Sequence, residues 1–183
     1  MQLRAALEPR LDIAQQLYPE ILKSILDYTD FVDENTDEEN IEYQKLKDKL
    51  HALTGKDMSR FDLYEWWEQE SAEVFAFTIA LPDPQKVENI TKEELAEIIR
   101  RISSSHFEGL TWEIAADRGV ETLTFIEYWS LYLDDYYHAL LELNFKTYNY
   151  SKLFSRQKKK EKKDFYWYTD EEKIEKLWNN GVF

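Results

Sequence analysis

Apolar residues recur at three- and four-residue steps through most of this 183-residue chain. This spacing places apolar side chains on one face of an α-helix. The first clear segment runs from Tyr18 to Val32, and Pro19 lies where a first-turn proline fits. A shorter helical pattern precedes it from Leu11 to Leu17, so Pro19 could instead kink one long helix.

Three further segments continue the helical pattern. One spans Tyr43 to Leu53 and is followed by Gly55, which we expect to end the helix in the left-handed conformation. The next is expected to start at Asp57 or Ser59 and to carry aromatic residues on one face. Residues 72–81 would also suit a buried strand, but no turn signal separates them from the preceding residues, so we favour helix.

Two capping boxes mark helix starts in the second half of the chain. They pair Thr91 with Glu94 and Thr169 with Glu172. Between them, apolar residues cover two sides of a segment from Phe125 to Phe145, which is typical of a central helix. A small hairpin is possible near Ala116 to Thr122.

These patterns predict a mainly α fold. We expect a single-domain antiparallel helical bundle of five to seven helices over residues 1–183, with at most one small β-hairpin. A basic loop is expected at about residues 152–164. The longest strongly apolar run, Val74 to Pro82, is far shorter than the roughly 20 residues that span a bilayer.

Composition excludes several classes of protein. The chain has only four glycines and no cysteine. A glycine-rich phosphate-binding loop cannot be built from so few, widely separated glycines. Disulfides, thiolate metal sites and cysteine nucleophiles are excluded as well. No serine-nucleophile motif occurs, and we predict no catalytic residue, metal ligand or cofactor; an enzyme is the less favoured interpretation.

Charged residues are unevenly distributed along the chain. The net charge is −14, and a short basic segment from Lys152 to Lys163 lies in an otherwise strongly acidic sequence. An acidic surface repels phosphates and anionic lipids, so a membrane is not expected as a partner and nucleic acid is unlikely for the surface as a whole. A basic protein partner is favoured. The N-terminal residues lack the apolar stretch of a secretory signal, so we expect a cytoplasmic protein.

The strongest candidate site is an acidic stretch from Asp27 to Glu42, which holds eight acids and no base. Carboxylates around an aromatic anchor suit recognition of a basic protein surface. Either of the two embedded aromatic residues could serve as the anchor. The predicted partner-binding residues are Tyr28, Asp30, Phe31, Asp33, Glu34, Asp37 and Glu38.

The leading hypothesis is therefore a non-enzymatic, cytosolic protein-binding module. It could act as an acidic inhibitor or immunity protein that neutralises a basic protein such as a toxin nuclease. Alternatively, the acidic stretch is only a solvated junction between two helices and has no binding role.

Two other functions remain open. Asp48 with His51 and Asp135 with His138 have the spacing that presents metal ligands on one helix face, as in a helical-bundle metalloenzyme.

The segment 146–168 interleaves aromatic and basic residues, which is the combination that single-stranded nucleic-acid binding requires. Its bases are concentrated in one polar run, which is more typical of a solvated loop.

Overall fold

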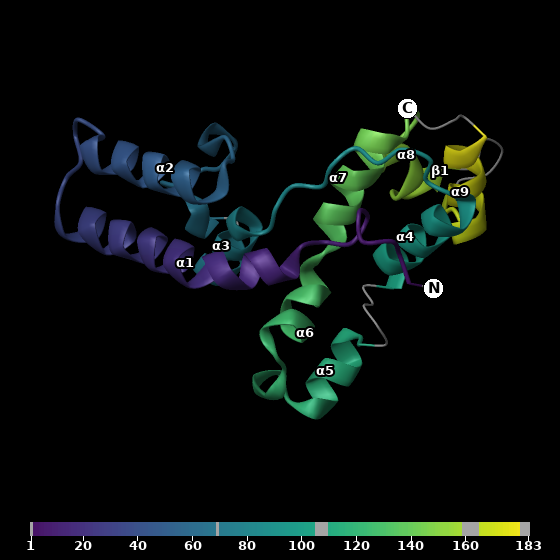
Figure 1. Ribbon diagram of the computed structural model, residues 1–183, viewed down its shortest axis with the longest axis horizontal. Coiled ribbons are helices and arrows are strands. Elements are labelled where there is room, and N and C mark those ends of the chain that lie inside the picture. Colours follow the sequence, from purple (N-terminus) through teal and green to yellow (C-terminus); the bar gives the residue numbers. More distant parts are fainter. Residues whose placement is uncertain (1, 69, 105–109, 159–164, 180–183) are drawn as a thin grey trace. The chain divides into compact units, whose positions relative to one another are not determined.

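The computed structural model describes residues 2–68, 70–104, 110–158 and 165–179. These residues are mainly helical, with one small two-stranded antiparallel sheet, as Figure 1 shows. The predicted helical fold class is confirmed. Within the described ranges, no helix has the length and apolar character needed to cross a bilayer.

The chain is organised into two compact units. One consists of Arg10–Pro82 and is called the inserted unit here, because the chain leaves the other unit to form it and then returns. The other consists of Met1–Pro9 with Asp83–Phe183 and is called the terminal unit. The single-domain organisation expected from the sequence stays a prediction.

The inserted unit contains three α-helices among its described residues. They are α1 (Leu11–Glu34), α2 (Ile41–Thr54) and α3 (Ala72–Ala80). Short 3-10 turns occupy Met58–Arg60 and Trp66–Glu68. α1 packs against both α2 and α3, and Figure 1 shows α1 in purple beside α2 in blue. The fully buried side chains of this unit include Ile21, Ile25, Leu50, Leu63 and Ile79.

Several local sequence signals of the inserted unit correspond to features of the structure, and one does not. Pro19 lies inside one continuous helix, and Gly55 ends α2 with a φ of 71° as expected. Residues 72–80 are helical, which confirms the choice of helix over strand.

The helix predicted from Asp57 or Ser59 onward is wrong, because aspartate side chains bind the nearby backbone instead. Asp57 accepts a hydrogen bond from the Ser59 amide (2.9 Å), and Asp62 accepts one from the Tyr64 amide (3.1 Å).

The terminal unit contains six α-helices and the sheet among its described residues. The helices are α4 (Lys92–Ser104), α5 (Trp112–Arg118), α6 (Phe125–Trp129), α7 (Asp134–Asn144), α8 (Tyr150–Leu153) and α9 (Asp170–Trp178). The strands are β1 (Gln157–Lys158) and β2 (Phe165–Tyr166), and 3-10 turns occupy Val120–Thr122 and Ser130–Tyr132. α4 packs against α7 and α9. Both predicted capping boxes are present.

Two predictions for the terminal unit are wrong. The long helix expected from Phe125 to Phe145 is divided into α6 and α7 by a 3-10 turn, where the Ser130 hydroxyl donates to the Glu127 carbonyl (2.6 Å). The hairpin expected near Ala116 to Thr122 is absent from that segment. α5 ends there at Arg118 and is capped by Gly119, whose φ of 84° suits glycine, and a 3-10 turn follows. The small sheet lies at β1 and β2 instead.

Candidate functional site: the acidic end of α1

The acidic residues predicted from the sequence gather at the C-terminal end of α1. Asp30, Asp33 and Glu34 belong to its last two turns, and Glu38 follows in the connector to α2. All four side chains are exposed. We call these four residues the acidic face.

Asp33 and Glu34 lie in the last turn of α1, which is an electrostatically unfavourable position for an acid. The C-terminal end of a helix carries partial negative charge, so each exposed carboxylate there destabilises the helix by about 0.3–1 kcal/mol at low salt. The last turn of α1 contains no basic residue that would offset this effect. The acidic face is therefore poorly placed for stability of α1 and well placed to attract a cation.

Asp37 has a different role from its acidic neighbours. Its carboxylate oxygens accept hydrogen bonds from the backbone amides of Tyr43 (2.9 Å) and Glu42 (3.3 Å), in the first turn of α2. Negative charge is stabilising at this end of a helix. We therefore assign Asp37 to the folding of α2 and leave it out of the acidic face.

Tyr28 is not an exposed anchor, because only 6% of its surface is accessible. Its ring packs near that of Tyr43, with 6.0 Å between centroids. Burial raises the pKa of Tyr28 to about 12, and the charge of Asp37 adds to the increase. Within the described part of the chain, the Tyr28 hydroxyl is the one buried side-chain polar atom without a hydrogen-bond partner. Phe31, the other predicted anchor, is half-buried.

Two other aromatic residues of the inserted unit are exposed, and the sequence pattern did not identify them. Tyr64 and Trp67 are each 49% exposed, and their ring centroids are 6.1 Å apart. The neighbouring Trp66 connects them to α1, since its indole Nε1 donates to the Thr29 hydroxyl (3.3 Å). Thr29 lies one helical turn before Asp33. The segment that carries the aromatic pair is therefore attached to α1 at the residue that precedes Asp30.

A shallow groove of about 320 Å³ runs between α1 and α2. Its charged side chains already have partners, since Asp27 accepts from Lys23 (2.8 Å), Lys45 donates to Glu42 (2.6 Å) and Lys49 pairs with Glu20. The groove is therefore nearly balanced in charge. It is lined by Ser24, Asp27, Tyr28, Phe31, Glu42, Lys45, Leu46 and Lys49.

An open hollow of about 720 Å³ lies beside α7 in the terminal unit. His138 lines it, and its Nδ1 atom is 2.7 Å from the Tyr148 hydroxyl. The His138 ring also meets Tyr150 and Phe154 edge to face. Burial lowers the pKa of His138, although Asp135 acts in the opposite direction. The neutral ring can accept the Tyr148 proton at Nδ1, and a protonated ring cannot.

The lowered pKa of the half-buried His138 predicts that stability depends on pH. Its pKa is lower in the folded protein than in the unfolded chain, so its contribution is fully present above the unfolded value of about 6.5 and is lost as pH falls below it. We expect the free energy of unfolding of the wild type to decline more steeply below about pH 6.5 than that of His138→Gln. Urea unfolding across this range measures both profiles. Parallel profiles would contradict the assignment.

The histidine and aspartate pairs do not assemble a metal site in the described residues. No group of three or more His, Cys, Asp or Glu side chains in these ranges has the geometry to hold a metal ion. His51 Nδ1 is 2.8 Å from the Lys56 carbonyl, and Asp48 accepts a hydrogen bond from Gln44 (2.7 Å). His51 belongs to the inserted unit and His138 to the terminal unit. The metalloenzyme alternative stays a prediction.

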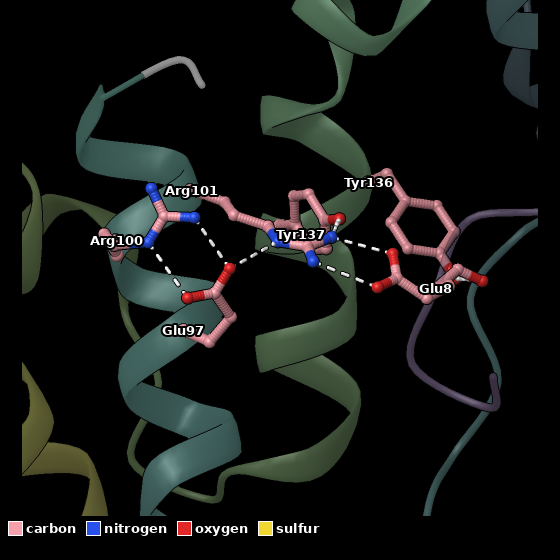
Figure 2. Close-up of polar contacts among 6 residues, drawn as sticks. All are labelled: Glu8, Glu97, Arg100, Arg101, Tyr136 and Tyr137. Carbon is pink, nitrogen blue, oxygen red and sulfur yellow. Dashed lines mark hydrogen bonds and ion pairs between the residues drawn. The ribbon is translucent and has the colours of Figure 1, made fainter. Parts of the chain in front are cut away.

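A buried cluster of charged residues joins α4, α7 and the N-terminal segment, as Figure 2 shows. Arg101 and Glu97 are 5% and 6% exposed, and the Arg101 Nε atom donates to Glu97 Oε1 (3.0 Å). The Arg101 guanidinium also donates to both Glu8 oxygens (2.7 and 3.0 Å) and to the Tyr137 hydroxyl.

The charged groups of this cluster are paired with one another. Burial alone would raise the pKa of Glu97, but hydrogen bonds from Arg100 and Arg101 outweigh it and hold the pKa at about 2. A buried carboxylate that is fully paired is typical of structural ion networks. We therefore infer that the cluster holds the N-terminal segment against α4 and α7 within the terminal unit.

No protein-family model, curated protein or solved structure matches this chain. Among the sites described, the acidic end of α1 combines exposed charge, exposed aromatic rings and an unfavourable placement for stability.

Proposed function

We propose that this chain is a cytoplasmic, non-enzymatic protein-binding module. Its inserted unit docks a basic protein through the acidic face and the neighbouring rings of Tyr64 and Trp67. The observation that carries this proposal is the set of uncompensated carboxylates at the C-terminal end of α1. Residues that break a local stability rule are expected at functional sites.

Charge and aromatic contacts act at different stages of binding. Long-range attraction between the acidic face and Lys or Arg side chains accelerates the encounter. Exposed aromatic rings then bury apolar area at the contact and attract cations over their faces. Arginine suits both contacts, because its planar guanidinium pairs with carboxylates and stacks on rings.

Occupation of a partner's basic surface would block any activity that depends on that surface. An inhibitor of a toxin nuclease is one protein that would work in this way, since a nuclease binds its substrate through basic residues. Our proposal therefore includes the more specific role of an inhibitor or immunity protein.

The proposal is tested by titration calorimetry with an oligoarginine peptide at low salt. The neutral-face variant carries Asp30→Asn, Asp33→Asn and Glu34→Gln, and leaves Asp37 intact because that residue caps α2. We expect its affinity to fall roughly tenfold, from about 0.5 kcal/mol for each exposed ion pair. Its thermal unfolding temperature should not fall, since the substitutions remove unfavourable charge from the helix end.

A matched control separates local geometry from net charge. It carries Glu93→Gln, Asp117→Asn and Glu121→Gln, three exposed acids of the terminal unit. The two variants have the same net charge. We expect the control to bind oligoarginine nearly as well as the wild type. An equal loss in both variants would show that affinity follows total charge and would overturn the proposal.

A further inference from the structure

The β1–β2 hairpin of the terminal unit has two different faces. Its antiparallel register pairs Gln157 with Tyr166 and Lys158 with Phe165. Paired residues point to the same side of a sheet, and successive residues alternate between sides. Lys158 and Phe165 therefore share one face, and Gln157 and Tyr166 share the other.

Continuation of this register by one residue pair brings Arg156 and Trp167 onto the face of Lys158 and Phe165. A direct contact supports this placement. The Arg156 guanidinium carbon lies 3.9 Å from the centroid of the Phe165 ring, as expected for diagonal neighbours on one face. We call Arg156, Lys158, Phe165 and Trp167 the stacking face.

The stacking face is directed to solvent. Phe165 is 47% exposed and Trp167 is 63% exposed, which makes Trp167 the most exposed large apolar side chain in the described residues. Arg156 and Lys158 are exposed too. The opposite face is covered, since Lys176 of α9 lies 4.5 Å from the centroid of the Tyr168 ring and Tyr166 is half-buried.

We propose that the stacking face binds single-stranded nucleic acid, with bases stacked on Trp167 and Phe165 and phosphates paired with Arg156 and Lys158. Exposed rings interleaved with cations are the combination that single-strand binding requires. The sequence alone did not establish this arrangement, because the bases and rings follow one another along the chain. The register of the hairpin brings them together on one surface.

A single strand fits this face better than the other anionic partners. An acidic polypeptide would pair with the two cations but would leave two flat, exposed rings without a matching contact. A duplex keeps its bases stacked internally, so they are not available to aromatic side chains. The proposal is independent of the acidic face, which belongs to the inserted unit.

Fluorescence anisotropy at low salt tests the proposal with a labelled oligothymidylate of about 12 nucleotides. We expect saturable binding by the wild type, with affinity reduced at least roughly tenfold in Trp167→Ala with Phe165→Ala. In a second variant, Arg156→Gln with Lys158→Gln, we expect the salt dependence to flatten. Two neutralised phosphates give the wild type a slope of roughly −1.4 in log affinity against log salt.

Four comparisons test whether binding depends on base stacking at this face. The Trp112→Ala variant should bind oligothymidylate like the wild type, because Trp112 is 40% exposed but belongs to α5 and not to the stacking face. An abasic oligomer and a duplex of the same length should bind more weakly than oligothymidylate, since neither offers a base to stack. Equal binding of the abasic oligomer, or unchanged binding after loss of both rings, would overturn the proposal. Tighter binding of oligoglutamate than of oligothymidylate would also overturn it, in favour of an acidic polypeptide.

Discussion

Replacement of Arg101 by Ala should lower the free energy of unfolding by about 3–5 kcal/mol. Arg101 is 5% exposed and pairs with both Glu97 and Glu8. Its removal takes one cationic partner from the buried Glu97 and removes the guanidinium that contacts both oxygens of the partly buried Glu8. Loss of one partner from a buried ion pair is strongly destabilising. The Tyr137 hydroxyl loses its contact with the guanidinium as well.

Urea unfolding compares this variant with a matched control, Arg118→Ala. Arg118 also pairs with a glutamate, since its Nη1 atom is 2.9 Å from Glu127, but its side chain is 44% exposed. Exposed ion pairs contribute about 1 kcal/mol at most. A comparable loss of stability in the two variants would contradict the view that burial makes the Arg101 cluster structural.

Removal of both exposed aromatic rings, by Tyr64→Ala with Trp67→Ala, should weaken oligoarginine binding about 30-fold. This figure corresponds to the roughly 2 kcal/mol associated with an interface hot spot. The loss should fall mainly on the dissociation rate, because short-range contacts act after the encounter. The neutral-face variant should differ by changing mainly the association rate.

Stopped-flow association and dissociation measurements separate these two effects. The matched control is Trp112→Ala with Tyr150→Ala, which removes a tryptophan and a tyrosine that are 40% and 54% exposed in the terminal unit. We expect this control to bind oligoarginine like the wild type. A similar loss in both double variants would mean that exposed rings bind the peptide without regard to their position.

Local signals allowed much of the fold to be predicted. The capping box of Thr91 with Glu94 and the glycine cap at Gly55 depend on residues a few positions apart, so the sequence alone identifies them. Where side chains bind the nearby backbone, the helical pattern was misleading. Asp62 and Ser130 each form such bonds, and each lies where a predicted long helix is interrupted.

The sequence predicted the exposed acids of the candidate site but not its aromatic residues. Exposure of Asp30 and Asp33 follows from their charge. Burial of Tyr28 and exposure of Trp67 depend on packing between segments far apart in the chain, which periodicity does not specify. The lack of a base in the last turn of α1 was a local signal that could have identified the site, once the end of the helix was known.

The salt dependence of the association rate with oligoarginine tests most directly whether the position of the carboxylates controls binding. Stopped-flow measurements over a range of ionic strengths compare the wild type, the neutral-face variant and its matched charge control. We expect a steep decline with salt for the wild type and the charge control, and a shallow one for the neutral-face variant. Three parallel curves would contradict this account, because attraction would then depend on total charge and not on the end of α1.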